Sequence, residues 1–97
     1  MMIRKLTDHE YAQCHTEIAE NGDTYFFSYQ TMVAEIRVDE ITGWRWLYVH
    51  GLYSATTRKQ LGWFMREYCD MDYHTAKLIY EDNEWICLDT GEVVSNS

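Results

Sequence analysis

The sequence has no proline and no long apolar run, and it has only three cysteines in 97 residues. Without proline, the loops depend on Gly, Asn, Asp and Thr to reverse the chain. No apolar stretch approaches the roughly 18 residues of a membrane helix, and the opening Met1–Leu6 is too short for a signal peptide. The cysteines Cys14, Cys69 and Cys87 show no Cys-x-x-Cys or Cys/His metal spacing. We therefore expect reduced thiols in a cytoplasmic protein with no membrane segment, metal or cofactor.

Acidic residues outnumber basic ones two to one, with 16 Asp and Glu against 8 Lys and Arg and a net charge of -8. Hydrophobic residues still make up 46% of the chain and aromatic residues 15%, enough for one folded domain over residues 1–97. The charge is uneven, because residues 1–66 carry a net -1 and residues 67–97, which we call the acidic third, carry -7. The chain lacks the basic stripe of most nucleic-acid-binding proteins, which disfavours direct contact with nucleic acid.

The most strongly patterned stretch predicts a main helix from about 55 to 69. Ser54 or Thr57 can cap its start, and Gln60 follows Thr57 by the three residues of a capping box. Four apolar side chains then recur with helical spacing and form one face: Leu61, Phe64, Met65 and Tyr68. The hydroxyl groups beside Arg58 and Lys59 can also be interpreted as an anion site at a helix N-terminus. Capping explains them more simply, because no glycine-rich loop accompanies them.

The residues before the main helix predict an N-terminal helix and then a sheet. Thr7 and Glu10 have the spacing of a capping box, and Asn21-Gly22 can end a helix, so we expect a helix from Thr7 to about Glu20. From Tyr25 to His50, aromatic and β-branched residues predict an antiparallel sheet with a hairpin loop at 39–43. In its middle strand, alternation places four residues on one side: Met32, Ala34, Ile36 and Val38.

The segment after the main helix fits two structures. Apolar runs at 77–80 and 84–88 flank a polar stretch at 81–83 and favour a hairpin. Tyr73, Lys77 and Tyr80 also fit the spacing of a helix. We favour the hairpin. The predicted fold is therefore α+β, with a small antiparallel sheet packed against the main helix, an N-terminal helix and a C-terminal hairpin.

Two motifs in the centre of the chain resemble those of a known group of proteins. Residues 28–36 read S-Y-x-T-x-V-A-x-I, and residues 53–59 read Y-S-x-T-T-x-K ahead of the main helix. Small uncharacterised proteins of bacteriophages and integrated mobile elements carry similar patterns, and the likeness extends over about residues 25–68. The resemblance implies a phage-type protein at work in a host bacterial cell, and it carries no known activity. This chain departs from the pattern in its N-terminal segment and its acidic third.

The acidic third supplies the candidate binding residues. Its acids are interleaved with Tyr and Trp, and such aromatic side chains often dominate protein interfaces. An acidic surface can also occupy a groove of Lys and Arg meant for phosphates. We therefore predict a partner-binding surface made by Glu67, Asp70, Asp72, Tyr73, Tyr80, Glu81, Asp82, Glu84 and Trp85. The alternative is a solvated surface that only keeps the protein soluble.

These features predict a non-enzymatic interaction protein with a basic protein partner. With the resemblance, its most concrete form is an anti-CRISPR-like inhibitor that occupies the basic nucleic-acid-binding surface of a host defence nuclease complex. A different class stays open, a module that binds a small ligand or nucleotide in an aromatic pocket made by residues such as Tyr29, Trp44 and Trp46. The scattered histidines and cysteines predict no catalytic residue and no metal site. A homodimer also stays open, because exposed aromatics and edge strands invite pairing.

Overall fold

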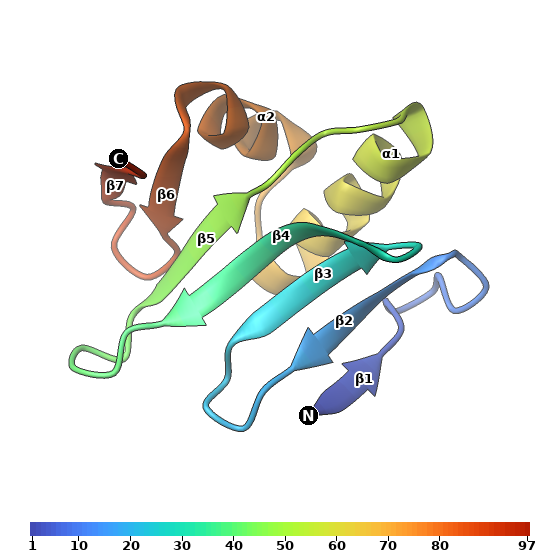
Figure 1. Ribbon diagram of the computed structural model, residues 1–97, viewed down its shortest axis with the longest axis horizontal. Helices are drawn as coiled ribbons and strands as arrows, with labels where there is room; N and C mark the ends of the chain where they lie inside the picture. Colours follow the sequence, from blue (N-terminus) through green and yellow to red (C-terminus); the bar gives the residue numbers. More distant parts are fainter.

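Seven strands form one antiparallel sheet in the computed structural model, which describes all of residues 1–97 (Figure 1). In chain order, which is also their order in the sheet, they are β1 (Met2–Arg4), β2 (Cys14–Ile18), β3 (Thr24–Ser28), β4 (Thr31–Val38), β5 (Arg45–Val49), β6 (Glu84–Cys87) and β7 (Val93–Ser95). Between β5 and β6 the chain forms α1 (Ala55–Phe64), the π-helical turn η1 (Met65–Cys69) and α2 (Tyr73–Asp82). Both helices lie on the same face of the sheet. The predicted α+β class is confirmed.

The predicted N-terminal helix is wrong, because residues 14–18 form β2 and residues 7–12 are turns. Cys14 and Thr16 are buried, while His15 lies on the other face, which is the two-residue period of a strand. An isolated helix of this length is marginal in water, whereas β2 gains a full ladder with β3. Tyr11, which falls within the predicted helix, is 99% exposed and packs on nothing. The expected helix end at Gly22 (φ 97°) is instead the turn into β3.

The main helix is confirmed over its predicted length, as α1 followed by η1. Ser54 is the N-cap, and its Oγ accepts a hydrogen bond from the Thr57 backbone N–H at 3.2 Å. Leu61, Phe64 and Met65 are fully buried against the sheet. The Phe64 ring stacks on Phe26 of β3, with 4.7 Å between ring centroids. The local capping and apolar signals were therefore sufficient to locate this element.

A buried chain of hydroxyl groups ties α1 to β3. Ser54 Oγ donates to Thr57 Oγ1 at 3.2 Å, and Ser28 Oγ donates to Gln60 Oε1 at 2.6 Å. Ser28 and Thr57 oxygens lie 3.1 Å apart, and the two other bonds leave Thr57 as the donor of this pair. The two sequence motifs thus meet in space, because Ser28 comes from the first and Ser54 and Thr57 come from the second. Ser28, Ser54 and Thr57 therefore have a structural role, because their hydroxyl groups join α1 to β3.

A β-bulge in β4 changes which residues face the helices. Phe26 lies opposite Ala34, whereas Phe27 lies opposite Met32, so Val33 is the extra residue. Ala34 and Ile36 are buried on the side of the helices, but Met32, which was predicted to share their side, lies on the other face with Phe27. The prediction for Met32 is wrong because simple alternation takes no account of the bulge. The hairpin loop predicted at 39–43 is confirmed between β4 and β5.

The C-terminal hairpin is present, formed by β6 and β7, but the first arm predicted for it is part of α2. The Asp72 side chain caps the start of α2, and Asn83 ends it in the left-handed conformation (φ 52°). Ala76 and Ile79 bury the inner face of this helix. The helical spacing of Tyr73, Lys77 and Tyr80 was therefore the correct signal for this segment, and the hairpin favoured for residues 77–80 was wrong. No helix of the protein is both long and apolar enough to cross a membrane.

All three cysteines are buried free thiols. Burial raises the pKa of Cys69 to about 12 and also raises the pKa of Cys14 above its usual value. Only the thiolate attacks thiol reagents, so we expect almost no reaction of the native protein with a disulfide reagent such as Ellman's at pH 8. In denaturant, all three thiols should react at once. Rapid labelling of the native protein at even one cysteine would contradict the burial of these side chains.

Candidate interaction surface

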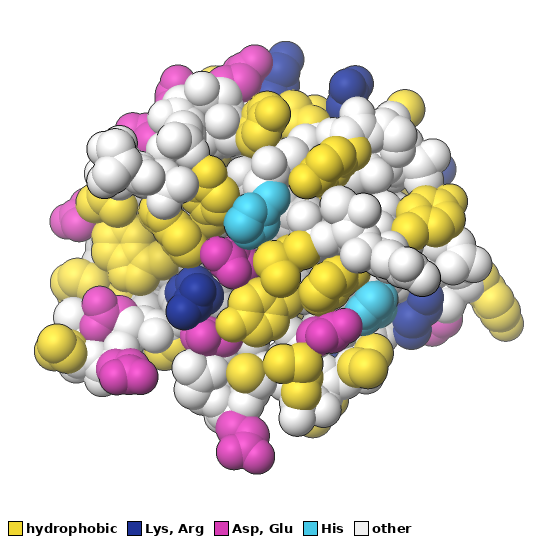
Figure 2. Space-filling model, viewed as in Figure 1, with side chains coloured by type: hydrophobic (Ala, Val, Ile, Leu, Met, Phe, Trp, Pro, Cys, Tyr) yellow, Lys and Arg dark blue, Asp and Glu magenta, His cyan; other side chains and the backbone are white.

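One broad face of the sheet has no helix against it. Figure 1 shows both helices behind the sheet, and Figure 2 shows the near face, with hydrophobic side chains over the strands. Successive side chains of a strand point to opposite faces, so the neighbours of buried Phe26 and Leu47 point away from the helices. Five aromatic residues lie partly exposed on this surface, which we call the open face: Tyr25, Phe27, Trp46, Tyr48 and Trp85.

Tyr48 lies at the centre of a group of rings on the open face. Its ring centroid is 5.0 Å from that of Trp85 on β6 and 5.0 Å from that of His50. The Tyr48 hydroxyl donates to the Asn83 side chain, and Trp85 Nε1 donates to Asn96 Oδ1 at 2.8 Å. The Tyr48 and Trp85 rings are thus each held by a neighbouring ring and by a hydrogen bond. Rings already fixed in this way lose little side-chain entropy when a partner covers them.

Two carboxylates on the open face lie beside histidines. His15 Nε2 is 3.0 Å from Glu17 Oε2, and His50 Nε2 is 3.7 Å from Glu35 Oε1. The His15 ring also stacks on Phe27, with 5.1 Å between centroids. Glu17 is partly exposed and Glu35 is almost fully buried, and both pairs place a carboxylate among the rings. The combination of ring faces and carboxylates suits guanidinium and ammonium groups, which bind both.

Asp23 fixes the edge of the open face near β3 and β4. Its Oδ1 accepts the Val38 backbone N–H at 2.8 Å, and its Oδ2 lies 3.2 Å from Arg37 Nε. Burial alone would raise the pKa of Asp23, but these hydrogen bonds, one to Asn21 and the Arg37 charge together lower it. Burial and the Asp23 charge raise the pKa of the neighbouring Tyr25. Asp23 is therefore a structural anion that holds Arg37 at this edge of the open face.

The first part of the acidic third is used in local structure. Glu67 Oε1 accepts the Thr7 backbone N–H at 2.7 Å, and Asp70 ends η1 in the left-handed conformation (φ 54°). Asp72 caps α2, as its Oδ1 accepts the Thr75 backbone N–H at 3.1 Å. Tyr73, the first residue of α2, is half-buried. These predicted contact residues thus have roles within the fold.

The remaining predicted contact residues are divided between two places. Tyr80, Glu81 and Asp82 are exposed at the far end of α2, about 10–14 Å from its start at a rise of about 1.5 Å per residue. Glu84 begins β6, and Trp85 lies on the open face. The structure therefore does not bring the nine residues together on one surface. Trp85 is the one that joins the aromatic group around Tyr48.

The aromatic pocket considered for a small ligand does not form. Tyr29 lies in the turn before β4, and Trp44 lies just after the hairpin loop beyond its other end. The eight residues of β4 separate them by about 25 Å. Trp46 lies on the open face. None of these three residues lines any of the four hollows in the surface.

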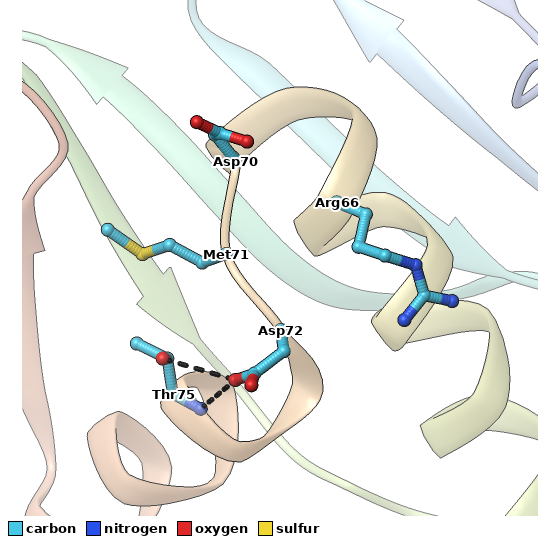
Figure 3. Close-up of a pocket in the computed structure, with 5 residues that line it drawn as sticks. All are labelled: Arg66, Asp70, Met71, Asp72 and Thr75. Atoms are coloured by element: carbon cyan, nitrogen blue, oxygen red, sulfur yellow. Dashed lines mark hydrogen bonds between the residues drawn. The ribbon is translucent and has the colours of Figure 1, made fainter.

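The largest hollow lies where η1 meets α2, and it is polar. Its volume is about 510 Å³, and Figure 3 shows its five residues, Arg66, Asp70, Met71, Asp72 and Thr75. The Asp72 carboxylate turns toward Thr75, and Arg66 points the other way. No three His, Cys, Asp or Glu side chains of the protein lie close enough together to hold a metal ion.

Sequence reasoning missed most of the open face. Two strands carried a usable signal, since Tyr25 and Phe27 alternate with buried residues, as do Trp46 and Tyr48. Aromatic residues on the second side of a strand are consistent with two structures. That side of the sheet can be covered by another layer of the protein, or it can be exposed to solvent. The deciding fact is that both helices pack on one side, which depends on the path of the chain between β5 and β6. That path is not visible in the pattern of either strand.

One protein family has a model that matches residues 1–82, and its description is "Family of unknown function (DUF8033)". The match spans β1 to β5 and both helices, and it ends before β6. Comparisons with curated proteins and with solved structures gave no match. The function must therefore be argued from the surface of this chain.

Proposed function

The chain belongs to the DUF8033 family, whose function is unknown, and we propose that it is a non-enzymatic protein that binds a basic protein partner through its open face. The observation that carries this proposal is the bare side of the sheet, with five partly exposed aromatic residues and the carboxylates of Glu17 and Glu35. Monomeric proteins rarely leave a broad aromatic surface uncovered unless it has a partner. The proposal keeps the predicted class of function and moves its surface from the acidic third to the sheet.

Size and charge both support a protein partner. The molecule measures 36 × 30 × 21 Å, and the open face is one of its two broad sides. A stable interface needs about 800 Å² from each partner, which a side of this size can supply. The net charge of -8 attracts a basic partner from a distance, while Glu17, Glu35 and the rings bind its Lys and Arg at contact. A second copy of the chain fits less well, because two such charges repel.

The resemblance to phage and mobile-element proteins gives the proposal a narrower form. In that form the partner is a nucleic-acid-binding defence complex of a bacterial host, such as a CRISPR nuclease, whose basic cleft the protein occupies. Charge and resemblance support this form. A pull-down from bacterial lysate, washed at low and high salt, provides its test. A nuclease complex that elutes at high salt would favour it, since salt screens such contacts.

Two double variants with the same change of charge test the open face directly. Glu17→Gln/Glu35→Gln removes two charges from the open face, and Glu81→Gln/Asp82→Asn removes two from the exposed end of α2. The probe is a peptide of alternating Arg and Gly, and its affinity is read from the quenching of tryptophan fluorescence. We expect the first variant to weaken binding at least tenfold, about 1.4 kcal/mol or more, because charge-assisted hydrogen bonds are lost. The second variant should change it less than about twofold.

Thermal unfolding of both variants is the check that each is folded. The same two variants serve in the pull-down, where the open-face variant should lose the captured complex and the α2 variant should keep it. Equal losses in both would show that only net charge matters. A loss confined to the Glu81/Asp82 variant would return the interface to the acidic third. Either result would overturn the open-face proposal.

A further inference from the structure

Three of the eight basic residues of this acidic chain lie together on the outer surface of the helices. Arg58 and Lys59 are in the first turns of α1, and Arg66 is in η1, eight residues after Arg58. Gly62 lies between the two arginines, four residues from each, and both arginines line the same hollow as Gly62. All three side chains are exposed, and none forms an ion pair with a carboxylate.

These three residues line a groove that contains no acid. Its volume is about 280 Å³, and its remaining lining residues are Gly62, Trp63 and Tyr73. Gly62 leaves the floor as bare backbone where α1 passes the start of α2, and an added Cβ there would meet Tyr73 Cβ at 3.6 Å. We call this hollow the basic groove. It lies in the helical layer, away from the open face, so the inference drawn from it is independent of the proposed function.

None of the acidic residues near the basic groove forms an ion pair with its cations, and two of them, Asp72 and Glu67, accept hydrogen bonds from other parts of the chain. Figure 3 shows Arg66 directed away from Asp70 and Asp72, and the Asp72 carboxylate accepts two hydrogen bonds from Thr75. Glu67 on the other side of Arg66 accepts the Thr7 backbone N–H. Asp8 lines a neighbouring hollow with Trp63 and Arg66 but forms no ion pair with Arg66, and the Arg58 guanidinium donates only a long hydrogen bond of 3.5 Å to the Tyr53 carbonyl. No carboxylate therefore neutralises the three cations by direct contact, and they can bind a ligand.

Trp63 positions the Lys59 ammonium group and leaves little ring surface on which a ligand could stack. The Lys59 Nζ lies 5.4 Å from the centre of the Trp63 ring, and the His9 ring stacks on Trp63 with 3.6 Å between centroids. Trp63 is thus already engaged by two side chains and offers little room to stack a base. Recognition in this groove therefore depends on negative charge and not on a flat ring.

We propose that the basic groove binds the phosphate groups of a small phosphorylated molecule. Two guanidinium groups can each make paired hydrogen bonds to phosphate oxygens, and an ammonium adds a third positive charge. A volume of about 280 Å³ admits a diphosphate and is small for a larger ligand. The phosphate backbone of a nucleic acid offers the same chemistry, but a long polyanion would meet the remaining negative surface of a chain with net charge -8.

The test is a titration with inorganic pyrophosphate followed by amide NMR at constant ionic strength. We expect saturable shifts centred on Gly62 and on the side-chain Nε–H groups of Arg58 and Arg66, with sodium chloride at the same ionic strength giving none. A ten-residue oligothymidylate is titrated in parallel. We expect it to bind more weakly than pyrophosphate, and tighter binding of the oligonucleotide would overturn the assignment to a small molecule.

Matched variants separate the groove from general charge. Arg58→Gln/Arg66→Gln should weaken pyrophosphate binding more than about tenfold, whereas Arg4→Gln/Lys77→Gln, which changes two exposed bases elsewhere, should weaken it less than about twofold. Gly62→Ala adds a methyl group to the floor without a clash and should lower affinity while the fold is kept. Equal weakening in both double variants, or no saturation by ~10 mM pyrophosphate, would overturn the proposal.

Discussion

Phe64→Ala should be the most destabilising single substitution considered for this protein, with a loss of about 3–5 kcal/mol in the free energy of unfolding. Phe64 is fully buried, and its ring lies between Phe26 of β3, at 4.7 Å, and Tyr68 of η1, at 5.1 Å. Truncation would leave a cavity where the helical layer meets the sheet. The total free energy of unfolding of a small domain is about 5–15 kcal/mol, so the loss of this one ring would remove a large part of it.

Urea unfolding followed by circular dichroism measures this effect. The control is Tyr11→Ala, which also removes an aromatic ring but at a position that is 99% exposed, and it should change stability by less than about 0.5 kcal/mol. If Phe64→Ala cost less than about 1 kcal/mol, the Phe26–Phe64 contact would not be the centre of the core.

The second large effect concerns the buried hydroxyl chain between Ser28 and Thr57. Ser28→Ala leaves Gln60 Oε1 and Thr57 Oγ1 without their shared partner, and Thr57→Val removes the donor to Ser28 while keeping the shape of the side chain. Each change should cost about 1–3 kcal/mol, because a buried polar group loses its hydrogen bond. The double variant should cost at least ~0.5 kcal/mol less than the sum, since both changes break the same bond.

Thr56→Val is the matched control for this cycle. Thr56 precedes Thr57 in the first turn of α1, but it is exposed and its hydroxyl makes no hydrogen bond within the protein. The control should lie within about 0.5 kcal/mol of the parent protein. Strict additivity of Ser28→Ala and Thr57→Val would mean that the two sequence motifs are not coupled through these hydroxyl groups.

The sequence predicted those elements whose signals are local. The main helix has its N-cap at Ser54 and its apolar stripe from Leu61 onward, and both signals lie within the helix itself. Residues 7–20 carried signals of the same kind and yet contain a strand. There the pairing of Cys14–Ile18 with β3 outweighed local helix propensity. Pairing partners are distant in the sequence, so this competition could not be judged from the segment alone.

The candidate surface was predicted less well than the fold. Counting charges identified the acidic third, but Asp72 and Glu67 satisfy backbone N–H groups, and Glu81 lies at the far end of α2. A count of charges does not distinguish a capping carboxylate from one that faces a partner. The aromatic residues of the open face were visible in the sequence. Their exposure depends on the helices all packing on the opposite side.

The path of the chain through the sheet has a consequence for the order of assembly. Strands β2 to β5 each pair with the strand just before them in the chain, so this part can form early from local contacts. The pairing of β6 with β5 must instead wait for the whole helical segment to close a loop. We therefore expect Trp85 on β6 to reach Tyr48 late in folding. The complete aromatic group is therefore a mark of the finished molecule, which partly folded chains lack.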